Sequence, residues 1–306
     1  MSFQNLRSPH LAILVAASLW GTLGVSYAVI LRGGGVDPVT LVTLRLVGAA
    51  VVLLGYAVIR RPAALRLPRR DWPLLGGIGV VSFAVFYIAL VYAFQWTSVP
   101  VATVLLYTAP VWVAVGEHLF LGYRLERAST VALVCAVGGA APVADLVHLW
   151  RGSINLSGIG AALLSAVTYA SFSVLGKRAL RRLPPLTVLV YGLGIGAICL
   201  LAIKMVQTGP AIPTPRLTLE ILAWPCFAVT VLPVALYTLG LRALRPSTAA
   251  ILATFEPVVA VALSAVVLAQ RLGPTQIVGA LLVVAGAVYL SLRPPVVPTT
   301  RQEPAG

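Results

Sequence analysis

Charged residues are scarce in this chain of 306 residues, and negatively charged ones are the scarcest. Asp and Glu together number eight, against 22 Lys and Arg, and all four types make up only 10% of the sequence. Hydrophobic residues make up 59%, and the mean hydropathy of +0.98 is far above the range of soluble globular domains. This composition excludes an ordinary soluble domain and indicates an integral membrane protein.

Cysteine and histidine are also rare. The three cysteines, Cys135, Cys199 and Cys226, lie in apolar runs and form no CxxC pair, so we expect no disulfide framework. The three histidines lack the spacing of metal ligands, so we expect no metal site and no cofactor. Motifs such as GxxxxGK[ST], HExxH and GxSxG are absent, which argues against ATP-driven transport by this chain and against an enzyme.

Long apolar runs fill almost the whole sequence. About 20 apolar residues in a helix cross the ~30 Å of bilayer hydrocarbon, and ten runs come close to that length. The expected spans are Leu11–Leu31, Val39–Ile59, Trp72–Gln95, Val99–Leu119, Ala128–Val147, Leu156–Gly176, Leu186–Met205, Leu219–Leu241, Ser247–Leu268 and Pro274–Leu292. We expect the Pro-rich residues 294–306 to form a disordered cytoplasmic tail.

The Lys and Arg residues gather on alternate loops between these spans. Sixteen of them fall on the side that carries both termini and five on the other side, while Arg45 lies within the second span. Positive residues concentrate on cytoplasmic loops, so both termini are predicted to be cytoplasmic. The net charge of +14 therefore reflects the orientation of the chain in the membrane, which we expect to be the cell (plasma) membrane. No nucleic-acid partner is expected.

The sequence contains an internal repeat, in which the second half resembles the first. An offset of 147 positions pairs Pro38 with Pro185 and Gly139 with Gly286, and it also pairs Arg124-Leu125 with Arg271-Leu272. We divide the chain into residues 1–150 and 151–293, with five spans each. Because five is odd, the second half enters the membrane from the opposite side. Inverted repeats of this kind are typical of secondary transporters, whose substrate site lies near the midplane between the halves.

The same offset pairs two apolar segments that contain a proline. They are 103–112, with Pro110, and 250–259, with Pro257. A proline in an apolar helix removes a hydrogen bond and frees a carbonyl group, which hydrocarbon tolerates only beside protein or a water-lined cavity. We therefore expect both segments to break their helices and to line a polar pathway.

Two charged residues within the spans are candidates for substrate binding. Glu256 lies near the middle of the ninth span, where it would bind a substrate ammonium or carry a proton, or else hydrogen-bond to neighbouring helices. Arg45 would pair with a substrate carboxylate or extend toward the lipid headgroups. Glu117 and His118 are expected near the cytoplasmic end of the fourth span as an ordinary solvated pair rather than a proton-handling one.

Aromatic residues are the other candidates for the cavity. An aromatic lining would suit amphipathic or cationic solutes, although each ring also suits packing or contact with lipid. The rings in question are Trp20, Tyr87, Tyr107, Trp112, Tyr169 and Tyr237. Ridges of small residues, such as Ala132, Ala136 and Ala140 or the GxxxG of Gly192 and Gly196, would pack within the chain or in a homodimer.

The sequence resembles the drug/metabolite transporter superfamily, and within it the ten-helix EamA-type members. The resemblance rests on Leu19-Trp20-Gly21, on Leu44-Arg45 and on the two proline segments, and it covers residues 8 to 293. Where such proteins often carry Gly-Glu after the proline helix, this chain has Gly122-Tyr123 and Ala269-Gln270.

The resemblance implies an all-α membrane fold, with helices 1, 3, 4, 6, 8 and 9 around a central cavity and helices 5 and 10 behind them. It also implies export or exchange of amino acids or related small metabolites by alternating access. Two alternatives remain open: a flippase of a lipid-linked sugar, and a membrane subunit that binds a partner and transports nothing.

Overall fold

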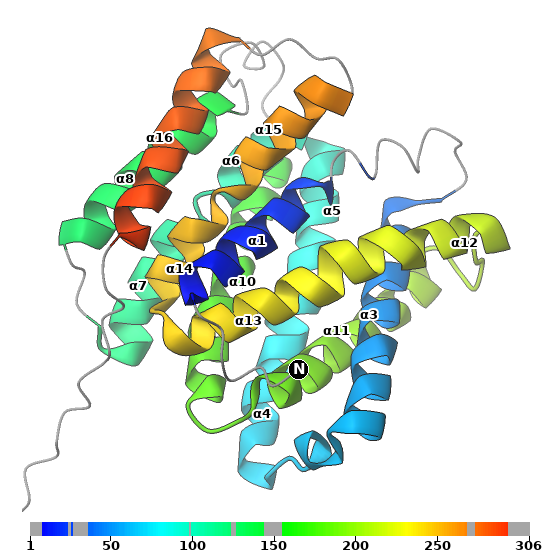
Figure 1. Cartoon of the computed structure of the whole chain (residues 1–306). Coiled ribbons are helices and arrows are strands. Elements are labelled where there is room, and N and C mark those ends of the chain that lie inside the picture. The colour runs from blue at the N-terminus through cyan, green and yellow to red at the C-terminus, as the bar shows by residue number, and fades with distance from the viewer. Residues whose placement is uncertain are drawn as a thin grey trace, which may run out of the picture.

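The computed structural model describes residues 8–23, 26, 36–97, 99–123, 127–143, 155–267 and 273–292 (Figure 1). Every regular element in these ranges is a helix. Eight described helices are long and apolar enough to cross a membrane, and Pro9–Gly21 and Arg127–Ala140 are shorter apolar helices. The predicted all-helical membrane fold is confirmed. The predicted tail at 294–306, the end of the first span and the Ala269-Gln270 turn lie outside the described residues.

The described part of the first half forms five apolar helical segments, of which the third and fourth are composite. Its elements are α1 (Pro9–Gly21), α3 (Pro38–Arg60), η1 (Pro62–Leu65), η2 (Arg69–Asp71), α4 (Trp72–Gly77), η3 (Ile78–Val85), α5 (Phe86–Trp96), α6 (Val99–Leu106), α7 (Ala109–Leu121) and α8 (Arg127–Val143). The elements η2 to α5 run on as one long helix, Arg69–Trp96.

The second half follows the same order. Its elements are α10 (Leu156–Leu180), α11 (Pro185–Gln207), α12 (Pro215–Ile221), η4 (Leu222–Val231), α13 (Leu232–Ala243), α14 (Pro246–Ala253), α15 (Glu256–Val267) and α16 (Pro274–Ser291). The elements α12 to α13 again form one long helix, Pro215–Ala243, which crosses the face of the molecule in Figure 1.

Prolines define where many of these helices begin. Proline suits the first helical position because its missing N–H would have no partner there. Pro38 follows Asp37, whose carboxylate accepts a hydrogen bond from the Thr40 backbone N–H at 2.8 Å and so caps α3. Pro185, at the matching position of the second half, begins α11.

Both proline segments are broken helices. The first stops at Leu106 and restarts at Ala109, and the second stops at Ala253 and restarts at Glu256, so that Pro110 and Pro257 each stand second in the restarted helix. At each break a threonine hydroxyl donates to a carbonyl of the preceding turn: Thr108 to Leu105 at 2.7 Å and Thr254 to Ile251 at 2.6 Å. At each break, a threonine side chain therefore provides a hydrogen-bond donor for a backbone carbonyl group.

The third segment of each half contains a stretch of π-helix, η3 in the first and η4 in the second. In η4, Pro225 lies inside the helix, and the Thr230 hydroxyl donates to its carbonyl oxygen at 2.9 Å. No sequence motif marks η3. Wider turns of this kind are frequent near functional sites because they rotate the following side chains relative to an α-helix.

The helices of one half pack mainly against those of the other. The most extensive contacts join α8 to α16, α5 to α10, α3 to α11 and α1 to α13. The small-residue ridges serve these contacts within the chain: Gly196 packs against Phe83 of η3, and Gly286 against Ala132 and Cys135. The helices α8 and α16 lie side by side at one side of the bundle, as the family resemblance implied for helices 5 and 10 (Figure 1).

The contact between α8 and α16 predicts different outcomes for two adjacent glycines. A Cβ atom on Gly139 would lie 2.6 Å from the Gly279 carbonyl oxygen, whereas one on exposed Gly138 would meet nothing within 4 Å. We expect Gly139→Ala to lower the free energy of unfolding by about 1–3 kcal/mol, the typical cost of overpacking. Gly138→Ala should be neutral or slightly stabilising, because alanine favours helix. Thermal unfolding in detergent measures both, and equal shifts would contradict the close approach.

Candidate functional site

An aromatic cluster joins the two halves of the chain. Trp20 of α1 lies 5.6 Å from the Tyr237 ring of α13 and 6.4 Å from the Tyr169 ring of α10, between ring centroids. Tyr237 is fully buried and shares a 2.7 Å hydrogen bond with the Ser173 hydroxyl of α10. Trp20 and Tyr169 are only partly buried. The cluster thus combines rings with fixed positions and rings that keep some accessible surface.

The same cluster continues into the first half. Phe86 lies 5.6 Å from Tyr169 and 4.7 Å from Tyr87, again between ring centroids. The guanidinium carbon of Arg45 in α3 stands 4.8 Å from the centre of the Tyr87 ring, which is cation–π geometry. Arg45 is only 3% exposed, so it does not extend toward the headgroups. A fixed positive charge therefore stands at this end of the aromatic cluster.

A carboxyl group lies in the same region. Glu256 occupies the first position of α15, directly after the helix break, and lies within hydrogen-bonding reach of the Tyr107 side chain at the matching break of the first half. It is near enough to Arg45 and Tyr169 for electrostatic interaction. The site thus combines a guanidinium group on α3 with a carboxyl group on α15.

Seven of the eight residues singled out from the sequence meet here. They are Trp20, Arg45, Tyr87, Tyr107, Tyr169, Tyr237 and Glu256. The eighth, Trp112, is 40% exposed, and its indole N–H donates to the Thr108 hydroxyl at 3.2 Å on the surface of α7. Pro110 and Pro257 are buried at the two helix breaks.

Sequence reasoning missed three members of the cluster. Phe86, Phe172 and Ser173 have no charge and no counterpart in a motif, yet Phe172 lies 6.1 Å from Tyr237 between ring centroids. For Phe172 and Ser173, the spacing from Tyr169 in the sequence was the signal that could have identified them. Phe172 and Ser173 follow Tyr169 by three and four positions, which places all three on one face of α10.

The expectation for Glu117 was wrong. It is not a solvated residue: it is 2% exposed, and its carboxylate forms an ion pair with Arg245. The reason is tertiary, because the end of α7 packs against the start of α14, 130 positions later. His118 is exposed, as expected, and its Nδ1 lies 3.0 Å from the Tyr123 carbonyl oxygen.

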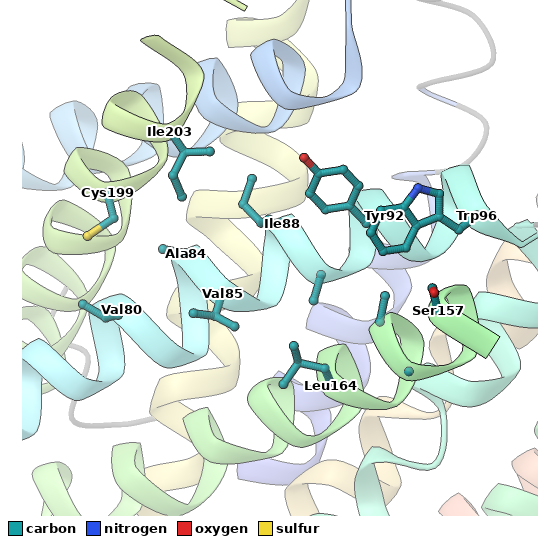
Figure 2. Close-up of a pocket in the computed structure, with 13 residues that line it drawn as sticks. Val80, Ala84, Val85, Ile88, Tyr92, Trp96, Ser157, Leu164, Cys199 and Ile203 are labelled. Atoms are coloured by element: carbon teal, nitrogen blue, oxygen red, sulfur yellow. The ribbon is translucent and has the colours of Figure 1, made fainter. Parts of the chain in front are cut away.

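A separate groove of about 420 Å³ lies between η3, α5, α10 and α11 (Figure 2). Its walls are almost entirely apolar, with Val80, Ile88, Leu164 and Ile203 among them, and Tyr92 and Trp96 stand at one end. None of the eight residues singled out from the sequence lines it. The groove therefore differs in both place and chemistry from the charged aromatic site.

Comparison with known proteins finds transporter relatives over nearly the whole chain. A model of the EamA-like transporter family matches residues 7–144 and again residues 156–292. A protein of Archaeoglobus fulgidus named an uncharacterized transporter is 28% identical over 292 residues, which cover 94% of this chain and 97% of that protein. The uncharacterized transporter YwfM of Bacillus subtilis is 26% identical, with 93% and 94% covered.

A crystal structure gives the same fold. The two structures superpose with a TM-score of 0.77. The matched residues make up 92% of this chain and 95% of the other chain, and their sequence identity is 20%. At that identity the likeness concerns the fold alone.

The bond between Ser173 and Tyr237 predicts a non-additive pair of substitutions. Tyr237→Phe and Ser173→Ala each leave a buried hydroxyl without its partner, whereas the double variant removes both. We expect each single variant to lower the unfolding midpoint and the double variant to lower it by less than the sum. The expected coupling is about 0.5–1.5 kcal/mol, the range for hydrogen bonds between membrane helices. A double-mutant cycle on thermal or denaturant unfolding measures it, and strict additivity would contradict the bond.

Proposed function

Since the chain belongs to the EamA-like transporter family, we propose that it is a secondary transporter that exports or exchanges amino acids or related small metabolites by alternating access. The observation that carries this proposal is the placement of Arg45 and Glu256 beside one aromatic cluster, at the junction of the two halves. Transporters built from inverted repeats place their substrate at such a junction.

The chemistry of the site supports a small zwitterion as substrate. A guanidinium matches a carboxylate in shape and charge, so Arg45 would receive the substrate carboxylate. Glu256 would receive the ammonium group. The partly buried rings of Trp20 and Tyr169 would contact the substrate side chain by stacking or by cation–π interaction.

Glu256 also offers a route to proton coupling. A carboxylate in the interior of a membrane protein is unfavourable without a cation or a proton, so its charge has to be balanced in every transport state. A proton would replace the substrate ammonium when the site is empty. In that cycle Tyr107 hydrogen-bonds Glu256 in its protonated and its ionised form, because a phenol both donates and accepts.

We propose that the chain is oriented in the bilayer with both termini in the cytoplasm. With both termini cytoplasmic, the loops that carry sixteen Lys and Arg residues lie inside and those that carry five lie outside. The homologues are bacterial and archaeal, which supports the plasma membrane. The boundary between the halves is proposed at residues 150 and 151.

The apolar groove of Figure 2 does not favour the flippase alternative. A lipid-linked sugar needs polar partners for its headgroup along the lateral path. The groove is lined almost entirely by apolar side chains, and no charged residue is among those that line it.

Flux from proteoliposomes tests the proposal. Vesicles are loaded with pooled amino acids and related metabolites, and the loss of each solute is followed with and without a pH gradient. We expect selective loss from vesicles with native protein, and a pH response that Glu256→Gln abolishes, because an amide carries neither the proton nor the negative charge. Glu220→Gln is the matched control, since Glu220 forms an exposed ion pair with Arg216. Loss of no solute from vesicles with folded native protein would overturn the proposal.

A further inference from the structure

A buried polar contact connects the end of α7 in the first half to the start of α14 in the second. The Glu117 Oε1 atom accepts hydrogen bonds from the Arg245 guanidinium, with Nε at 3.0 Å, and from the Ser247 hydroxyl at 3.1 Å. Its Oε2 atom accepts a bond from the Ser247 backbone N–H at 2.8 Å. One carboxylate thus satisfies a side-chain cation, a hydroxyl and a helix N-terminus.

The contact is dry. The Glu117 side chain is 3% exposed and the Arg245 side chain 7%, and the Tyr123 ring lies against Arg245 with its centre 4.9 Å from the guanidinium carbon. Taking these charges out of water is costly, and only the full set of partners compensates for that cost. The pair is therefore stable only while α7 and α14 touch.

The second half holds its side of the contact in place. Lys177 of α10 donates three hydrogen bonds from its ammonium group to carbonyl oxygens at the end of α13: Leu241 at 2.9 Å, Arg242 at 3.0 Å and Leu244 at 2.7 Å. These bonds fix the turn that leads to Arg245. The first half contributes the Glu117 carboxylate and the Tyr123 ring, so the contact opens if the end of α7 moves away.

An apolar layer separates this contact from the aromatic site. Val113, Ala170 and Ala250 pack together, each of them buried. Val113 lies one helical turn before Glu117, and Ala170 directly follows Tyr169 of the aromatic cluster. Ala250 lies between Ser247 and Glu256 along the chain. The route from Glu256 along α14 thus meets first an apolar layer and then a buried ion pair.

We propose that Glu117, Arg245 and Ser247 form a latch that closes the path between the two halves and must open before the aromatic site can exchange solute with that side. In the proposed orientation this side is the cytoplasm, so the inference rests on the proposed function. The structure is then the state closed to the cytoplasm. Each transport cycle breaks the latch and re-forms it.

Cysteine labelling tests the latch without measuring transport. Ala250→Cys is placed in a chain whose three native cysteines are replaced by serine, and a membrane-impermeant thiol reagent is applied to the cytoplasmic side of inside-out vesicles. With the latch intact the new thiol is covered. We expect Glu117→Gln to speed its labelling by about tenfold or more, which corresponds to about 1.4 kcal/mol of closed-state stability.

Two further variants keep the test decisive if Glu117→Gln does not fold. Ser247→Ala removes a single hydrogen bond of the latch and should speed labelling by less. Arg245→Lys keeps the charge but cannot form the same fork of bonds, and it should give an intermediate rate. Glu220→Gln, which breaks an exposed ion pair of the same type, should leave the rate unchanged.

The outcomes separate the latch from the proposed function. Faster labelling in the order Ser247→Ala, Arg245→Lys, Glu117→Gln supports the latch, even if native protein moves no solute in the flux assay. Equal labelling of native and latch variants overturns the latch, even if native flux is selective. Faster labelling in Glu220→Gln as well would also overturn it, because the effect would then reflect general loosening.

Discussion

No water reaches the backbone N–H and C=O groups in the hydrocarbon core of a bilayer, so a helix can be interrupted there only where protein accepts the freed groups. In this chain Thr108 and Thr254 donate their hydroxyls to carbonyls beside the two breaks, and Thr230 does so beside Pro225. The interruptions are therefore confined to the interior between the two halves. That confinement places Tyr107 and Glu256, one at each break, within hydrogen-bonding reach of each other.

The contacts between the halves are of two physical kinds. Close backbone contacts at Gly139 and Gly196 allow almost no sliding, because a neighbouring carbonyl or side chain fills the space a methyl group would need. The Glu117–Arg245 contact consists instead of an ion pair and directional hydrogen bonds, which are lost when α7 and α14 separate. A bundle that holds α8 to α16 by the first kind of contact and α7 to α14 by the second can move at one place and stay rigid at another.

Much of this architecture could be predicted from the sequence, because the bilayer simplifies the problem. Long apolar runs predicted the spans, and Pro110 and Pro257, paired by the 147-residue offset, predicted the two broken helices. The π-helical turns of η3 could not be predicted, since no residue there forces them. The burial of Glu117 was missed for a similar reason: its partner Arg245 stands 128 positions away, and position near a span end gave no hint of that contact.

The charged residues break the symmetry that the rest of the chain keeps. Positions that shape helices recur after 147 residues, whereas Arg45 corresponds to Gly192 and Glu256 to Ala109. Gly192 packs against Ile78 and Phe83 of η3, so an arginine would not fit there. A symmetric site would present the same group from both halves and would hold a zwitterion equally well in two orientations. With the cation on α3 and the carboxyl group on α15, the proposed site would favour one orientation of a zwitterion, with the substrate side chain against the aromatic cluster.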